Sequence, residues 1–293
     1  MLAYLLNLAT LACINAVLAI TLNFIMGYAG IFSLAHAVFF GVGAYTAAWF
    51  AMHVSASIFL AIPAAMLAAA LLSLVLALPA LRVRGEYFVA ASLGLQVLAV
   101  TVFSEWKAFT GGLGGLIGIP PASLFGHDVT DPVQFLLLAL CGLVPVMLVT
   151  TALLRTSFGR NLKAIRDSES ASYAFGKNVA AIKTLSVAIS AALAAIAGAL
   201  YAFYIGFINV ESFMLNTSVL LMAMVIIGGT GTLLGPIVGT LLLMLLPSLF
   251  SYMTFLPQTQ IGAIQQMAYG LAMVLLMIFR PGGIVGARAR KSA

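Results

Sequence analysis

No Asp, Glu, Lys or Arg precedes Arg82 in this chain of 293 residues, and only uncharged residues such as Gly, Ser, Thr and Asn interrupt the apolar sequence before it. Over the whole chain 63% of residues are hydrophobic and 7% are charged, whereas a soluble domain usually carries about a quarter charged residues. Such a chain needs the lipid bilayer as its solvent. We therefore predict an all-α, polytopic bundle of about 8 to 10 transmembrane helices.

The sequence offers no sign of a cleaved leader or of a catalytic or metal site. Residues 1–10 lack the basic side chains that open a signal peptide, so we expect a retained first span. Cys13 and Cys141 fall within apolar runs, where Cys usually acts as a small hydrophobe. The three His residues lie in different segments, without a second ligand at metal-binding spacing. No metal site is predicted, and these residues give no support to an intramembrane enzyme.

The net charge of +6 is concentrated in short stretches rather than on one face. Apart from Lys107, the basic residues occupy positions 82–84, 155–183 and 280–291. Short basic loops beside spans mark the cytoplasmic side of a membrane protein. This distribution predicts membrane topology and gives no reason to expect nucleic-acid binding.

Windows of roughly 20 apolar residues, the length needed to cross a bilayer, give nine candidate spans, of which the seventh is short. If the three basic stretches are cytoplasmic, the loop 109–131, with two Asp and no Lys or Arg, lies outside. A plain count places the N-terminus outside, but one broken or re-entrant helix near Gly27 would move it inside. The nine segments are 4–23, 31–52, 58–79, 87–107, 133–154, 184–206, 217–228, 233–250 and 262–279.

Glycine marks two kinds of feature in these spans. Small residues recur every fourth position at 194–206 and at 231–239, which is typical of closely packed membrane helices. Glycine also interrupts the apolar pattern at 25–30 and 226–231. Such interruptions in two halves of a transporter indicate either discontinuous helices that line a pathway or two ordinary turns at the membrane edge.

The chain lacks the sequence marks of an energy source. All seven acidic residues fall at span ends or in loops, whereas ion-coupled carriers usually hold an ionisable group at membrane depth. The Gly176-Lys177 pair is followed by Asn178, and Ala171 stands where a P-loop needs its first glycine. A secondary carrier and a membrane scaffold or enzyme remain competing classes, but the pattern favours a protein that is powered by another subunit.

The longest cytoplasmic segment contains a predicted short amphipathic helix over 161–175. Asn161 is expected to cap its start, Leu162 and Ile165 share one face, and Gly176 is expected to end it in a left-handed conformation. Such a segment is either a solvated connector or a helix that docks into a groove on a cytoplasmic partner. In the docked arrangement we expect Leu162 and Ile165 to be buried in the partner, with Arg166, Asp167 and Glu169 forming ion pairs at the rim.

Four segments together resemble the branched-chain amino acid ABC transporter permease family. Residues 27–37 (GYAGIFSLAHA) are similar to the family's G-Y-A-G-x-x-S-L-G-H-A, with Ala35 in place of the usual Gly. Residues 82–88 (RVRGEYF) are similar to R-x-R-G-x-Y. Residues 110–120 (TGGLGGLIGIP) resemble T-G-G-x-x-G-L-x-G-I-P, although positions 113 and 114 are usually polar. The third motif indicates the LivM-like branch rather than the LivH-like branch.

The fourth segment, 159–176, resembles the family's coupling motif, G-R-x-x-x-A-I-R-(E/D)-x-E-x-A with a later G. Residues 228–236 (GGTGTLLGP) and 279–284 (FRPGGI) also fit the family. Two sets of site residues follow from the resemblance and from the glycine interruptions. The expected coupling residues are Gly159, Arg160, Leu162, Ala164, Ile165, Arg166, Asp167, Glu169 and Gly176. The expected translocation-path residues are Gly27, Gly30, Ser33, His36, Gly228, Gly229, Thr230 and Gly231.

The resemblance implies a type II-like ABC importer fold, with 1–293 as a single permease domain, 155–183 as its coupling loop and 280–293 as a cytoplasmic tail. It implies a LivH-like second permease, two cytoplasmic ATPases that hold ATP and Mg²⁺, a periplasmic binding protein, and a place in the bacterial inner membrane. No cofactor is expected on this chain. The implied substrate is a branched-chain or related amino acid; urea, amides and aromatic or carboxylic acids are the alternatives within the family.

Overall fold

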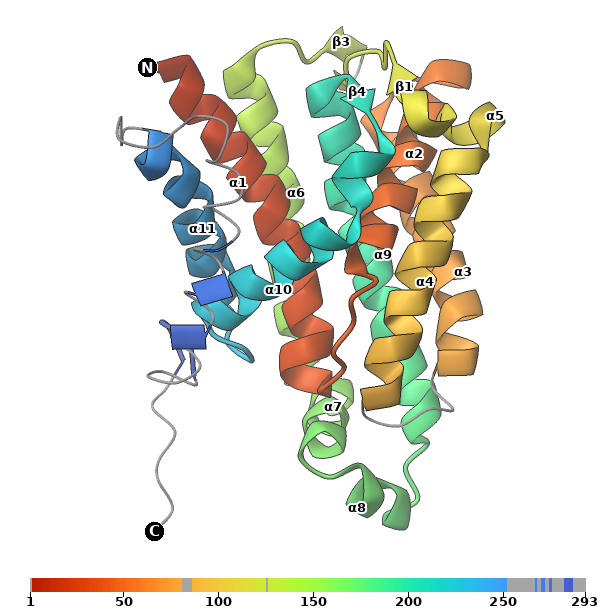
Figure 1. The fold of residues 1–293 in the computed structure, drawn as a ribbon, viewed down its shortest axis with the longest axis vertical. Helices are drawn as coiled ribbons and strands as arrows, with labels where there is room; N and C mark the ends of the chain where they lie inside the picture. Colours follow the sequence, from red (N-terminus) through yellow and green to blue (C-terminus); the bar gives the residue numbers. More distant parts are fainter. Residues whose placement is uncertain are drawn as a thin grey trace.

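A computed structural model describes residues 2–80, 86–124 and 126–251, together with 267, 270, 271, 274, 275 and 282–286. The described chain is a bundle of long apolar helices with very little sheet (Figure 1). Residues 82–85 of one motif, most of the ninth predicted span and most of the predicted tail lie outside the described residues. Within these described ranges, four helical stretches are long and apolar enough to cross a membrane, namely Ala3–Tyr28, Tyr87–Glu105, Pro132–Arg155 and Val179–Ile205.

The helices follow the predicted spans closely where the apolar pattern is continuous, and the all-α prediction is confirmed. The segment predicted as the seventh span is a helix of 14 residues. The helices are α1 (Leu2–Asn23), α2 (His36–His53), α3 (Ile58–Ala80), α4 (Glu86–Glu105), α5 (Lys107–Thr110), α6 (Pro132–Arg155), α7 (Ser157–Asp167), α8 (Glu169–Ala174), α9 (Val179–Ile205), α10 (Leu215–Gly228) and α11 (Gly235–Ser251).

The first two predicted spans have different boundaries in the structure. Helical backbone continues past Asn23, the last residue of α1, as a π-helix, η1 (Phe24–Tyr28). The following residues, 30–35, are not helical, so α2 begins at His36 rather than at residue 31. Gly30 allows this break because its φ of +70° lies in the left-handed region. The interruption predicted near Gly27 is therefore real and is placed between η1 and α2.

The small-residue stripe at 194–206 packs α9 against α2, as predicted. A Cβ at Gly43 would clash with the backbone of Ala195, and one at Gly198 would clash with the carbonyl oxygen of Phe40. Gly206 lies beyond the contact and ends α9 with a φ of +67°. The prediction of close packing at 231–239 is only partly correct. Gly235 and Gly239 pack against Gly228, whereas residue 231 belongs to the turn before α11.

Short elements cover the end of the bundle opposite α7 and α8 (Figure 1). The predicted external loop holds the 3₁₀ turn η2 (Gly112–Gly114) and strands β1 (Leu116–Ile117), β2 (Ser123–Leu124) and β3 (His127–Asp128). Strand β1 pairs with β4 (Phe207–Ile208), which precedes the turn η3 (Val210–Phe213), and β2 pairs with β3. The acidic loop and the basic loop thus lie at opposite ends of the bundle, and α1 begins at the acidic end.

Candidate functional site

The predicted coupling segment folds as two short helices, not one. The helix α7 begins at Ser157 and ends at Asp167, so Asn161 lies within it and does not cap it. Ser168 interrupts the helix because its extended backbone and its hydroxyl, which accepts from the Ala171 amide at 3.2 Å, cap the start of α8. Gly176 follows α8 with a φ of +72°, as predicted.

The apolar face of α7 is covered by the protein itself. Leu162 is fully buried and Ile165 is 3% exposed, because α7 packs against α6, α9 and η1. Gly159 packs against the backbone of Leu154. The hypothesis that Leu162 and Ile165 insert into a partner is therefore wrong, since neither side chain faces outward.

The outward surface of α7 and α8 has a different composition. Its exposed side chains are polar or small, except for Tyr173, which is 45% exposed, and Phe175, which directly follows α8 and is 83% exposed. Glu169 is half-buried and accepts from Lys183 Nζ at 2.7 Å, which ties α8 to the start of α9. The exposed residues among the predicted coupling residues are Arg160, Ala164, Arg166, Asp167 and Gly176.

Arg166 joins the coupling segment to the broken first helix. Its Nη1 donates to the carbonyl oxygen of Gly27 at 2.8 Å, and its side chain lies against Gly30. A second contact joins the same two elements, because the ammonium of Lys163 lies 5.7 Å from the ring centroid of Tyr28. Arg166 also pairs with Asp167 at 3.1 Å on the exposed surface. The resemblance identified Arg166 as a coupling residue, but its partner was not predictable from the sequence.

Asn23 connects the two interrupted segments and was missed by the sequence analysis. Its Oδ1 accepts from the Gly231 amide at 2.9 Å, and its Nδ2 donates to the Thr232 carbonyl at 2.7 Å. Gly27 packs directly on the Gly231 backbone. The sequence signal that could have identified Asn23 is an amide side chain at the end of an apolar span, one turn before a glycine interruption.

Four predicted residues from two separate sets therefore meet at one place, which we call the Gly27 junction: Gly27, Gly30, Arg166 and Gly231. The backbone groups freed by the helix interruption have partners there, in Arg166 and Asn23. Their role as lining of a translocation path stays a prediction.

The other predicted path residues lie apart from this junction or on its flank. His36 is fully buried, and its Nε2 lies 2.9 Å from Thr21 Oγ1. Ser33 is buried and its hydroxyl accepts from the Ala35 amide at 3.3 Å. Gly228 and Gly229 are covered by residues 282–286, since Ile284 and Val285 donate to the carbonyls of residues 227 and 228. Thr230 is exposed.

Substituting Gly27 tests how closely the junction is packed. A Cβ at this position would clash with the Gly231 backbone and with the Asn23 side chain, and backbone cannot move aside as a flexible side chain does. We expect Gly27→Ala to lower the free energy of unfolding by about 1–3 kcal/mol, the usual cost of overpacking.

Gly94→Ala in α4 is the matched control, because a Cβ there meets nothing within 4 Å. In thermal unfolding of the purified protein, the melting temperature of the control should equal that of the wild type or exceed it slightly, because Ala has a higher helix propensity than Gly. Equal melting temperatures for the two variants would contradict the packing of the junction.

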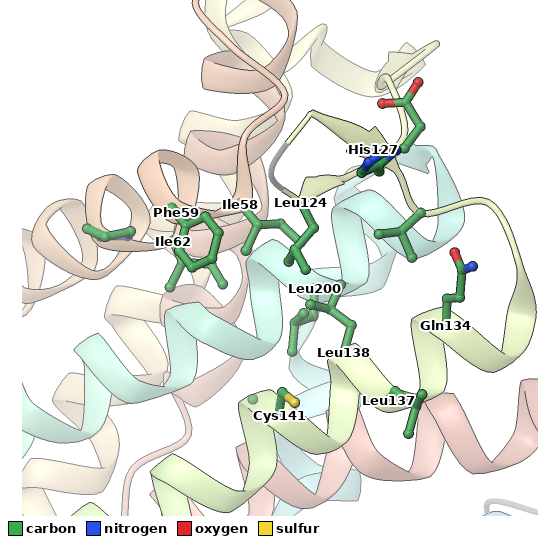
Figure 2. A pocket seen from close by; sticks show the side chains of 14 residues that line it. Ile58, Phe59, Ile62, Leu124, His127, Gln134, Leu137, Leu138, Cys141 and Leu200 are labelled. Carbon is green, nitrogen blue, oxygen red and sulfur yellow. The ribbon is translucent and has the colours of Figure 1, made fainter.

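A large cavity lies elsewhere, near the acidic end of the bundle (Figure 2). It has a volume of about 780 Å³ between α3, α6, α9 and the β2–β3 hairpin. Apolar side chains such as Phe59, Leu138 and Leu200 line it, and His127 and Gln134 lie at one end of it. None of the predicted coupling or path residues contributes to its lining. No group of three potential metal-ligating side chains occurs in the described ranges.

The chain is similar to known membrane transport components. Residues 4–280 match the family described as "Branched-chain amino acid transport system / permease component". The chain is 31% identical to the high-affinity branched-chain amino acid transport system permease protein LivM of Escherichia coli (strain K12), over 95% of this chain and 69% of that protein. It is 29% identical to a probable LivM of Methanocaldococcus jannaschii, over 48% of this chain and 43% of that protein. No solved structure gives a significant match.

Proposed function

Because the chain belongs to the family of branched-chain amino acid transport permease components, which it matches over residues 4–280, we propose that it is the membrane-spanning permease subunit of a binding-protein-dependent ABC importer. Its cargo is a branched-chain or related amino acid. The family match and the multi-pass apolar helices support this function. The names of the relatives favour branched-chain amino acids over the urea, amide and aromatic or carboxylic acid alternatives.

The energy for transport comes from partner subunits in this proposal. The sequence contains no P-loop, so ATP and Mg²⁺ are bound by two cytoplasmic ATPases and the permease itself catalyses no reaction. In the described spans, the acidic residues lie at helix ends or in loops, as Glu86, Glu105 and Glu211 do. This placement gives a secondary carrier no coupling site of the usual kind.

The observation that best supports coupling is the hydrogen bond from Arg166 to the Gly27 carbonyl. The exposed surface of α7 and α8, including Arg160 and Phe175, contacts the ATPase in this mechanism. Because Leu162 and Ile165 fix α7 in the core of the permease, α7 and α8 move together with the membrane helices they touch. ATPase closure is thereby transmitted to the Gly27 junction, where two interrupted helical segments meet.

The complete assembly is proposed to contain a second, LivH-like permease and a periplasmic binding protein, in the bacterial inner membrane. The chain forms a single permease domain over 1–293, in which 155–183 is the coupling loop and 280–293 is a cytoplasmic tail. Surrounding lipid completes the environment of the bundle, and no nucleic acid takes part. The family and the relatives are named as permease components of a transport system, which supports further components in general; their number and identity belong to the proposal.

Purification and reconstitution test the proposal together. We expect the chain to co-purify in mild detergent with two ATPases and a second permease. In liposomes, uptake of radiolabelled leucine should require internal ATP and added binding protein, and should be absent when the chain is reconstituted alone. Uptake by the chain alone under an ion gradient would contradict the proposal and favour a secondary carrier. ATP-dependent uptake of urea instead of leucine would keep the class and change the cargo.

A further inference from the structure

The cavity between α3, α6 and α9 combines apolar walls with a polar end, and we call it the α3–α6 groove. Its floor is Leu200 of α9, which is 1% exposed, and its sides carry apolar residues such as Ile62 and Leu138 (Figure 2). Phe59 on α3 and Leu137 on α6 line it and are 53% and 58% exposed, so the groove opens sideways on the outer surface of the bundle. Because both helices are apolar, this opening faces the acyl chains of the bilayer.

The polar end of the groove is formed by three exposed side chains, those of His127, Asp128 and Gln134. His127 and Asp128 belong to strand β3, and Gln134 lies in the first turn of α6, so all three are at the acidic end of the bundle. Within the described part of the chain, none of these side chains has a hydrogen bond or an ion pair with the protein. The groove therefore offers a ligand one carboxylate, one imidazole and one amide, and its lining contains no Lys or Arg.

Polar and apolar groups follow each other along the groove as they do across one leaflet of a bilayer. From Gln134 to Cys141 the lining descends along α6 by about 10 Å, at 1.5 Å per residue. The polar side chains thus lie at the height of the interface, and the apolar ones lie at the depth of the hydrocarbon. The β2–β3 hairpin lies over the polar end, where Leu124 and Val129 also line the groove (Figure 2). A spanning helix of a partner would collide with this hairpin, whereas a lipid ends at the interface.

We propose that the α3–α6 groove binds a phosphatidylethanolamine molecule of the leaflet at the acidic end. One acyl chain packs on Leu200 between α3 and α6, the ammonium of the headgroup pairs with the Asp128 carboxylate, and the Gln134 amide and the His127 ring donate to the phosphate. An anionic lipid such as phosphatidylglycerol has no cation for Asp128 and brings a net negative charge beside it. A free amino acid leaves most of the apolar wall without a partner. The proposal does not depend on which cargo is transported.

The first test compares two lipids and two aspartate variants. Dioleoyl phosphatidylethanolamine and dioleoyl phosphatidylglycerol are titrated onto the delipidated protein, purified with the subunits that accompany it, and native mass spectrometry measures the bound lipid. The wild type should bind the ethanolamine lipid about three- to fivefold more tightly, which is the upper range for one exposed ion pair. Asp128→Asn should lose this preference. Asp131→Asn is the matched control and should keep it, because Asp131 is exposed at the same end but does not line the groove.

Cys141 gives a second readout that needs no substitution, because this exposed thiol lines the groove. Added phosphatidylethanolamine should slow alkylation of Cys141 by N-ethylmaleimide severalfold and should leave Cys13, which does not line the groove, unchanged. Cys141→Trp fills the groove and should abolish the preference for the ethanolamine lipid. Leu140→Trp is its control and should keep the preference, because Leu140 is exposed on the same helix outside the groove.

Three outcomes of these experiments would overturn the proposal. They are equal affinities of the wild type for the two lipids, an unchanged preference in Asp128→Asn, and an alkylation rate of Cys141 that the ethanolamine lipid does not lower. Protection of Cys141 in the delipidated complex, but not in the chain alone, would also overturn it, because a partner subunit would then occupy the groove.

Discussion

Replacing Arg166 with Gln is expected to lower substrate uptake by at least tenfold while ATP hydrolysis by the partner subunits continues. The Arg166 guanidinium donates to the Gly27 carbonyl at 2.8 Å, and within the described part of the chain no other α7 side chain hydrogen-bonds to the interrupted first helix. A hydrogen bond to a charged group contributes about 1.5–3 kcal/mol, and 1.4 kcal/mol corresponds to a factor of ten in a two-state equilibrium. Uptake and ATPase rates are measured in the same proteoliposomes.

Two controls separate this contact from the loss of a charge. Arg155→Gln removes the same charge from the same basic region, where Arg155 is exposed, and should leave uptake nearly unchanged. Asp167→Asn removes the exposed partner of Arg166. Because exposed ion pairs contribute only about 0–1 kcal/mol, this variant should change uptake little. Unchanged uptake in Arg166→Gln, or an equal loss in Arg155→Gln, would show that the Gly27 contact does not carry the coupling.

Leu162→Ala is expected to lower the free energy of unfolding by about 2–5 kcal/mol, the usual range for a large buried side chain. Leu162 is fully buried against the protein's own helices, and α7 contacts α6, α9 and η1. Thermal unfolding of the purified chain measures the effect directly.

Phe175→Ala is the matched comparison, because this large apolar side chain of the same segment is 83% exposed. It should leave the melting temperature unchanged and weaken ATPase retention during purification. The reverse pattern, with a stable Leu162→Ala variant that no longer retains the ATPases, would restore the interpretation that Leu162 docks into the partner.

The contrast between Leu162 and Phe175 shows what a sequence pattern leaves open. The spacing of Leu162 and Ile165 correctly predicts a helix with one apolar face. It does not say which surface covers that face, because a helix buried on its own chain and one that docks on a partner have the same period. Family motifs identified Arg166, but its contact with Gly27 joins residues 139 positions apart and depends on the folded chain.

The helix interruptions were predictable because glycine and the apolar pattern change together at both sites. Their exact form was not, since the π-helical turn at Phe24–Tyr28 and the break at Ser168 depend on tertiary contacts and capping. Asn23 was missed for a similar reason. Its amide matters only because the turn at Gly231 lies beside it in the fold.

The contact between α2 and α9 has a consequence for the transport cycle. At Gly43 and Gly198 the two helices touch through backbone rather than through side chains. Side chains can change rotamer and let neighbours slide, but backbone in direct contact has no such freedom. The two helices therefore move as one rigid unit. The motion that exposes cargo first to one side of the membrane and then to the other must displace other helices relative to this pair, not α2 relative to α9.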